Sequence, residues 1–377
     1  MIFCKTRITA ASTLMALSFC CNAEELVIGQ VATFSNVQPV SKQLRLGAQV
    51  CFDAVNAKGG VHGALLKLVT KDRSLAAADS VAKTRELIAE AEPLALVGLQ
   101  GTAAMEELVK KRVLSEAGIP VVGIRTGAVS LHEPVNSLLF HTRASYAGEI
   151  AKIVTQLNTI GLKRVAVFHE NSVFGKEGLA LIENALKQRP GMLLAGSATY
   201  EPNSIEVANA AATILATGPQ GLILVANSAA AAEFYRHWRN AGGAAQVMAL
   251  SLVDSAEVVK RIGKEAASGL VVTQVVPEPS NRATPLVREW QNDMKKYGGA
   301  DAELNQTVLE GYLAAKVLVE ALKIAGPAPN RKKLRAALES MREYDAGGVV
   351  IGFSPGSHTG SKFVELAIIL RSGKLMR

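Results

Sequence analysis

Short apolar runs alternate along this chain with longer segments of helical periodicity, which is typical of βα repeats. In the first half, the apolar runs predict strands at 26–32, 65–70, 95–98, 120–123 and 164–170. The helical segments between them are 43–57, 76–91, 103–117 and 148–160. The runs are apolar almost throughout, so we expect parallel strands that are buried on both faces.

A second series of the same kind follows. It predicts helices at 175–188, 205–216 and 229–241, and strands at 193–200, 221–226, 246–250 and 269–276. Helices 285–297, 305–324 and 331–341 come next, and the chain ends in a pair of strands. Two similar α/β units in tandem are therefore predicted.

The composition agrees with this reading. The chain has 377 residues, of which 49% are hydrophobic and 20% are charged, enough apolar material for two packed lobes. The formal net charge of +8 falls to +6 without Lys5 and Arg7 of the first 23 residues, which is mild, and the basic residues are spread rather than gathered in a patch. We therefore predict no nucleic-acid partner.

The first residues have the pattern of a secretory signal. Lys5 and Arg7 precede an apolar run at 8–19, and small residues follow near Ala23, so we predict a signal peptide at 1–23 and a periplasmic protein. About a dozen apolar residues are too few to span a bilayer. Lipid attachment is disfavoured because Phe19 is bulky, and it stays as the alternative.

Cysteine usage is sparse once the signal is removed. Cys51 is then the one cysteine left, so no internal disulfide is expected, and we predict a small core residue on a helix. The chain has no Cys-x-x-Cys pair, no Gly-x-Gly-x-x-Gly after the first strand, no phosphate-binding loop and no Gly-x-Ser-x-Gly elbow. We predict no metal, no cofactor and no enzymatic activity.

Candidate ligand-binding residues, all polar except Phe174, follow the carboxyl ends of the predicted strands, where ligands of open parallel sheets bind. In the first unit these are Gln100, Thr102, Arg125 and Thr126; in the second they are Asn171, Phe174, Asn227, Ser251 and Asp254. The turn 99–104 offers free backbone N–H groups to an anion, although Thr102 as a simple N-cap is the alternative. If these edges of the two sheets face each other, a ligand-binding cleft lies between the two units.

Residues 56–63, Asn-Ala-Lys-Gly-Gly-Val-His-Gly, form a fairly specific motif. The motif resembles the Asn-Ala-Lys-Gly-Gly-hydrophobic-x-Gly turn of class I periplasmic solute-binding proteins of the Leu/Ile/Val-binding type, which serve ABC transporters. The resemblance extends along the mature chain through segments 26–31, 117–120 and 168–179. It implies the periplasmic-binding-protein type I fold, in which three crossing strands join two doubly wound parallel-sheet α/β lobes.

The resemblance also implies discontinuous lobes. By analogy, the crossings lie near His141, Gln274 and Ile351. The first lobe then comprises 24–141 with 275–350, and the second comprises 142–274 with 351–377.

Family members hold the α-carboxylate of an amino acid at positions that match Gly101, Thr102 and the run Arg125-Thr126-Gly127, where Gly127 replaces the usual Thr. The usual tyrosine before glycine is Phe174, a later cleft tyrosine aligns with Asn227, and the acid that pairs the ammonium aligns with Ser251. An unpaired buried ammonium costs on the order of several kcal/mol. Asp254 would supply the charge if its loop is arranged differently, whereas Arg125 suits a carboxylic acid without an amine unless it points to solvent.

The resemblance implies a monomeric protein that captures a small amino acid or related carboxylate and passes it to ABC permease subunits. A ligand-sensing receptor domain of the same fold is the alternative, and the absence of a following apolar segment argues against it. An exported hydrolase is disfavoured because the motifs supply no nucleophile with a base.

Overall fold

The computed structural model describes residues 24–34, 40–300 and 302–377, so the predicted signal peptide lies outside the described residues. The first α/β unit contains strands β1 (Glu25–Ala32), β2 (Leu65–Asp72), β3 (Ala95–Val97), β4 (Val121–Val122) and β5 (Leu139–Phe140). Its helices are α1 (Val40–Asn56), α2 (Ala77–Ala91), α3 (Thr102–Lys110), α4 (Val113–Ala117), α5 (Val129–His132), α12 (Pro285–Tyr297), α13 (Gln306–Ala325) and α14 (Arg331–Ser340).

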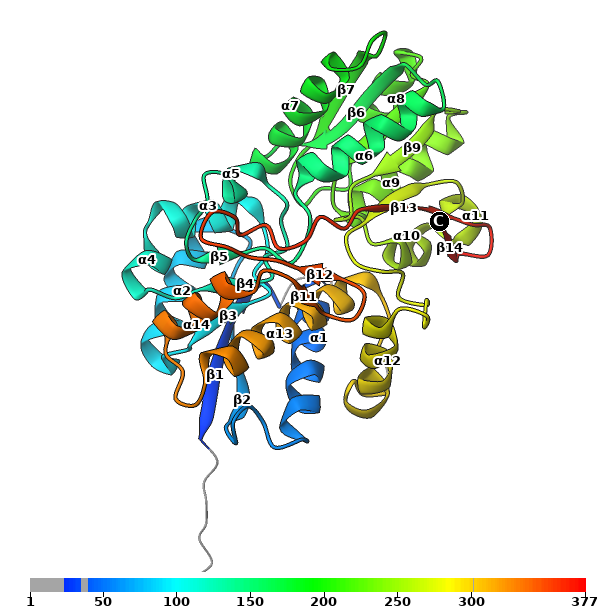
Figure 1. The fold of residues 1–377 in the computed structure, drawn as a ribbon. Coiled ribbons are helices and arrows are strands. Elements are labelled where there is room, and N and C mark those ends of the chain that lie inside the picture. Colours follow the sequence, from blue (N-terminus) through cyan, green and yellow to red (C-terminus); the bar gives the residue numbers. More distant parts are fainter. Residues whose placement is uncertain (1–23, 35–39, 301) are drawn as a thin grey trace, which may run out of the picture.

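The second unit is built from the middle and the end of the chain (Figure 1). Its strands are β6 (Arg164–Glu170), β7 (Leu193–Tyr200), β8 (Gly221–Val225), β9 (Gln246–Ala249), β10 (Val271–Gln274), β13 (Glu365–Ile369) and β14 (Leu375–Met376). Its helices are α6 (Tyr146–Thr159), α7 (Val173–Lys187), α8 (Ala208–Ala216), α9 (Ser228–Asn240), α10 (Ser255–Ile262) and α11 (Lys264–Ala267). A short ribbon of β11 (Tyr344–Asp345) and β12 (Val350–Ile351) lies between α14 and β13.

The first sheet has the order β2-β1-β3-β4-β5, and all its strand pairs are parallel. Its residues alternate between two cores: Ile28 and Val97 pack with α1 and α13, whereas Leu96 and Val121 pack with α2 to α4. Helices therefore cover both faces, as the apolar strand runs predicted.

Helices α1 and α13 lie side by side although they are far apart in the sequence (Figure 1). Their contact depends on two glycines. A Cβ at Gly47 would lie 2.0 Å from the carbonyl oxygen of Val308, and one at Gly311 would lie 2.2 Å from that of Leu44. The C-terminal helices thus close the core of the first unit, and Cys51 on α1 is buried there as predicted.

The second sheet has the order β14-β13-β10-β9-β8-β6-β7. Strands β6 to β10 pair in parallel, but β13 pairs antiparallel with β10 and β14 antiparallel with β13. The expectation of a purely parallel sheet was therefore wrong at this edge, because the returning chain enters the sheet in the opposite direction. The predicted α/β fold with two sheets is confirmed.

Two local details differ from the predicted pattern. The helix expected at 103–117 is broken between α3 and α4, where Arg112 adopts a left-handed conformation with φ of 56°. The position expected for the last crossing, Ile351, packs with Phe353 in the core of the first unit, and the second sheet resumes only at Glu365. The lobe boundaries themselves stay a prediction.

Candidate solute-binding cavity

A cavity of about 340 Å³ lies between the carboxyl ends of the two sheets. Its lining from the first unit includes Thr33, Val40, Ser41, Arg73, Leu75, Ala77, Gln100, Gly101, Thr102, Ala103, Ala104 and Arg125. Its lining from the second unit and the connection to it includes Tyr146, Glu170, Ser172, Val173, Phe174, Pro202, Asn203, Asn227, Ser228 and Leu252. This is the position where open α/β sheets bind ligands.

Arg73 supplies a positive charge to the wall formed by the first unit. It follows β2 directly and is 8% exposed. Its Nη1 donates to the carbonyl of Ser74 at 2.8 Å and its Nη2 to that of Gln100 at 3.4 Å, and no carboxylate among the described residues forms an ion pair with it. Burial lowers the pKa of Arg73, more than nearby Asp79 and Asp72 raise it. The charge is thus available to an anion in the cavity.

The start of α3 lies beside Arg73. Gly101 precedes the helix with φ of 92°, and a Cβ there would lie 3.7 Å from Nη2 of Arg73. No side chain caps this helix, because Gly101 and not Thr102 occupies the N-cap position, so the interpretation of Thr102 as an N-cap was wrong. The first N–H groups of α3 are therefore left for a ligand.

The second unit places an acid on the opposite wall. Glu170 ends β6, and its Oε2 accepts hydrogen bonds from the hydroxyl of Tyr200 at 3.0 Å and from the amide of Asn227 at 3.5 Å. Burial and the neighbouring Glu170 carboxylate raise the pKa of Tyr200, so this phenol stays a donor. Asn227 in turn caps α9 by accepting from the N–H of Ala230.

Six of the predicted site residues line the cavity: Gln100, Gly101, Thr102, Arg125, Phe174 and Asn227. Four do not. The hydroxyl of Thr126 lies 2.7 Å from that of Thr102, and Gly127 packs against Tyr146. Ser251 bonds to buried Arg143 and Glu149, while Asp254 caps α10 and lines a separate small pocket.

Sequence reasoning missed Arg73 and Glu170, the two charges described above. Each stands at or just after the carboxyl end of a predicted strand, so the rule that selected Arg125 and Asn227 also applied to them. The family resemblance drew attention to other positions. A residue-by-residue reading of every strand end would have included both.

Opposite charges on facing walls suit a small polar solute, and the cavity lining contains no nucleophile paired with a base. No group of metal-binding side chains occurs within residues 24–34, 40–300 and 302–377. The fold and the cavity define the class of a solute-binding protein.

The family model for periplasmic binding proteins matches residues 25–369. The chain belongs to this family, and within it to class I, the Leu/Ile/Val-binding type. It is 26% identical to Leu/Ile/Val-binding protein homolog 7 of Brucella suis biovar 1 (strain 1330) over 326 residues, which cover 81% of this chain and 78% of that protein.

Solved structures agree with this assignment. A substrate-binding periplasmic protein from Ralstonia solanacearum has a TM-score of 0.89 and 34% identity, covering 93% of this chain and 99% of that one. An extracellular ligand-binding receptor from Verminephrobacter eiseniae ef01-2 has a TM-score of 0.87 and 29% identity, covering 94% and 100%. The family and these relatives are binding proteins, so the prediction that the chain is not an enzyme is confirmed. Among the described helices, none is long and apolar enough to cross a membrane.

Proposed function

We propose that this protein captures a small amino acid or a related carboxylate between its two sheets and delivers it to an ABC importer. The observation that carries the proposal is the pair of opposite charges across one cavity, Arg73 on the first unit and Glu170 on the second. An α-amino acid carries one charge of each sign at its α-carbon, so it complements both walls.

The carboxylate of the ligand would bind Arg73 and the uncapped N–H groups at the start of α3. A guanidinium and helix N–H groups are both favourable partners for a carboxylate. The ammonium would bind Glu170, which Asn227 and Tyr200 hold by their hydrogen bonds. Glu170 then supplies the acid that the family has at the position of Ser251, and neither Asp254 nor an amine-free ligand is required.

The transport steps follow from this binding mode. The ligand docks on one lobe, the lobes close about the three crossing segments, and the permease recognises the closed form. Closure removes the ligand from water and strengthens its polar contacts. The protein would act as a monomer in the periplasm after loss of residues 1–23, without a lipid anchor.

The test uses the mature protein after unfolding and refolding, which removes bound ligand. We would screen amino acids and organic acids by thermal shift, since a ligand that prefers the folded state raises the midpoint. Leucine, isocaproate and isopentylamine form a matched set that differs only in the presence of the ammonium or the carboxylate. Binding of an amino acid is expected, and a screen without any amino acid or carboxylate that binds would refute the proposal and reopen the sensor alternative.

Glu170→Gln provides the decisive variant. We expect it to weaken amino-acid binding by about tenfold or more, equivalent to about 1.4 kcal/mol, and to leave the corresponding amine-free acid nearly unaffected. Glu206→Gln, an exposed acid of the same unit, is the matched control. Equal losses for the amino acid and for its amine-free analogue would show that Glu170 does not bind the ammonium.

A further inference from the structure

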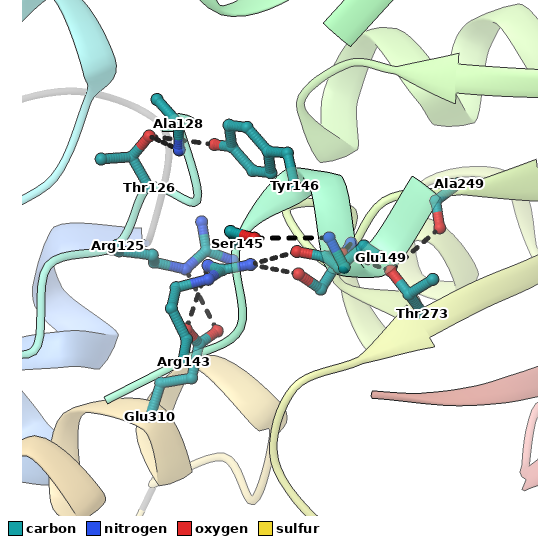
Figure 2. Close-up of polar contacts among 12 residues, drawn as sticks. Arg125, Thr126, Ala128, Arg143, Ser145, Tyr146, Glu149, Ala249, Thr273 and Glu310 are labelled. Carbon is teal, nitrogen blue, oxygen red and sulfur yellow. Dashed lines mark hydrogen bonds and ion pairs between the residues drawn. The ribbon is translucent and has the colours of Figure 1, made fainter. Parts of the chain in front are cut away.

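Four buried charges of alternating sign run from the cavity wall into the connection between the two units (Figure 2). Arg125 Nε lies 3.4 Å from Glu310 Oε1, and Glu310 Oε2 lies 3.2 Å from Arg143 Nη1. Arg143 Nη2 lies 3.0 Å from Glu149 Oε1. These residues are between 0% and 8% exposed, so water screens their charges only weakly.

A second acid, Asp254, is linked to Arg125 through a bridging hydroxyl group. Its Nη2 donates to the hydroxyl of Thr307 at 3.3 Å, and that hydroxyl donates to Asp254 Oδ2 at 3.1 Å. Glu310 and Thr307 belong to α13, whereas Asp254 caps α10 of the second unit. The guanidinium therefore contacts one acid of the first unit directly and is linked to an acid of the second unit through Thr307.

The charges in this cluster are compensated without a ligand. Two arginines, Arg125 and Arg143, face three acids, Glu310, Glu149 and Asp254. Ser251 and Thr273 complete the hydrogen bonds of Glu149 and add no charge. Arg73, in contrast, donates only to main-chain carbonyls, and no described carboxylate forms an ion pair with it, although Asp79 and Asp72 lie near enough to raise its pKa.

We propose that Glu310 determines the charge of the ligand that the cavity accepts, by neutralising Arg125 so that Arg73 alone binds an anionic group. Glu310 does this as a positioning residue, since it acts through Arg125. The inference rests on the proposed function, because it concerns which carboxylate that site admits. We therefore expect a ligand with one carboxylate, which binds at Arg73. A ligand whose second carboxylate would contact Arg125 is disfavoured.

The physical reason is the low effective dielectric of a buried site. An anion that approached Arg125 would lie a few ångströms from Glu310 as well, and attraction to one would be offset by repulsion from the other. At Arg73 the same anion meets a guanidinium that is ion-paired with no carboxylate of the described residues, together with the N–H groups of α3. The two arginines line one cavity but differ in the charge that they offer.

Sulfate is a suitable probe because its binding does not depend on which amino acid the protein carries. We would measure binding of radiolabelled sulfate by equilibrium dialysis at constant ionic strength, using refolded mature protein. The wild type should bind sulfate, and Arg73→Gln should weaken binding by about tenfold or more although Arg125 is intact. Arg73→Gln with Glu310→Gln should regain most of the affinity, because Arg125 then has no carboxylate in direct contact and reaches Asp254 only through the hydroxyl of Thr307. Arg85→Gln, an exposed arginine, is the control.

Three results would overturn the inference: a wild type that does not bind sulfate, an Arg73→Gln variant that binds as tightly as the wild type, or a folded double variant that regains nothing. If the double variant fails to fold, the Arg73→Gln result decides by itself, since it tests whether compensated Arg125 can hold an anion. Failure of every amino acid and carboxylate to bind would refute the proposed function while leaving the sulfate pattern intact. The two failures are therefore distinguishable.

Discussion

Individual charged residues in this protein differ mainly in what surrounds them. Arg73, Arg125 and Arg143 are all 8% exposed or less, yet Arg143 contacts two acids, Arg125 contacts one directly, and Arg73 binds only main-chain carbonyls. A buried charge that is paired serves packing and orientation, whereas one that lacks a partner is available to a ligand. The sequence shows three arginines and does not separate these roles.

Removal of Arg143 should be strongly destabilising. Arg143→Met would leave the buried carboxylates of Glu149 and Glu310 short of a partner, at a cost of about 3–5 kcal/mol in the free energy of unfolding. Urea unfolding monitored by circular dichroism measures this cost. Arg85→Met is the control, because Arg85 and Glu116 are 54% and 55% exposed and such pairs contribute about 1 kcal/mol or less. Similar losses in both variants would contradict the assignment of a buried ionic chain.

The cavity residues lie at the ends of strands and at the starts of helices, so the position of each element determines where they lie. Ser145, Ser172, Asn227 and Asp254 each cap the helix that follows, so they set the direction of α6, α7, α9 and α10. The sequence predicted most of these helices, because their apolar periodicity is local. It assigned Asn227 and Asp254 to a ligand, whereas the oxygen of Asn227 and one oxygen of Asp254 are occupied by helix N–H groups.

The start of α7 gives a test at the scale of one element. Gly175 and Gly148 both occupy the third position of a helix and donate to a capping serine, but their surroundings differ. A Cβ at Gly175 would lie 1.8 Å from the carbonyl oxygen of Glu170, whereas the nearest atom to one at Gly148 is 3.8 Å away.

Gly175→Ala should therefore push α7 away from the end of β6, destabilise the protein by about 1–3 kcal/mol and weaken ligand binding, because Glu170 moves with its backbone. Gly148→Ala should be neutral or slightly stabilising, since alanine favours helix more than glycine does. Thermal unfolding of the two variants, with the ligand from the screen added in a second scan, compares them directly. The prediction fails if Gly175→Ala melts at the same temperature as Gly148→Ala.

The whole molecule is held together partly by histidines where the chain returns from the first unit to the second. His132 and His141 stack with ring centroids 3.7 Å apart, and His358 stacks on Phe140 at 4.0 Å. The backbone N–H of His141 donates to the backbone carbonyl of His358, so segment 351–360 is attached to the end of β5. Burial lowers the pKa of all three imidazoles, that of His132 to about 4 and that of His141 well below its ordinary value.

Stability should therefore fall as the pH drops below about 6.5, the ordinary histidine value in the unfolded chain. Between that pH and the lowered folded-state pKa of about 4 for His132, the unfolded state binds more protons than the folded state, so acid favours unfolding. His132 alone should account for on the order of 2 kcal/mol between pH 7 and pH 5.

Urea unfolding at these two pH values tests the prediction. The drop in stability should be smaller in His132→Gln than in the wild type, and His237→Gln, which changes a partly exposed histidine, is the control. If His132→Gln loses as much stability between pH 7 and pH 5 as the wild type, His132 is not the cause of the pH dependence.

The sequence by itself determined the α/β class, the tandem units, most of the strands and the buried Cys51, because the periods of strands and helices are local properties of the chain, whereas the two-residue strand β5 is too short to show one. It also indicated the edge at which a ligand binds, since the carboxyl ends of parallel strands meet at one side of a sheet. Only the tertiary structure decided that β13 joins the second sheet antiparallel and that Arg73 and Glu170 face one cavity. It alone placed Thr307 beside Arg125, 182 positions away, and Glu310 beside both Arg125 and Arg143. Whether a charge is compensated depends on such distant neighbours, and no local pattern in the sequence encodes them.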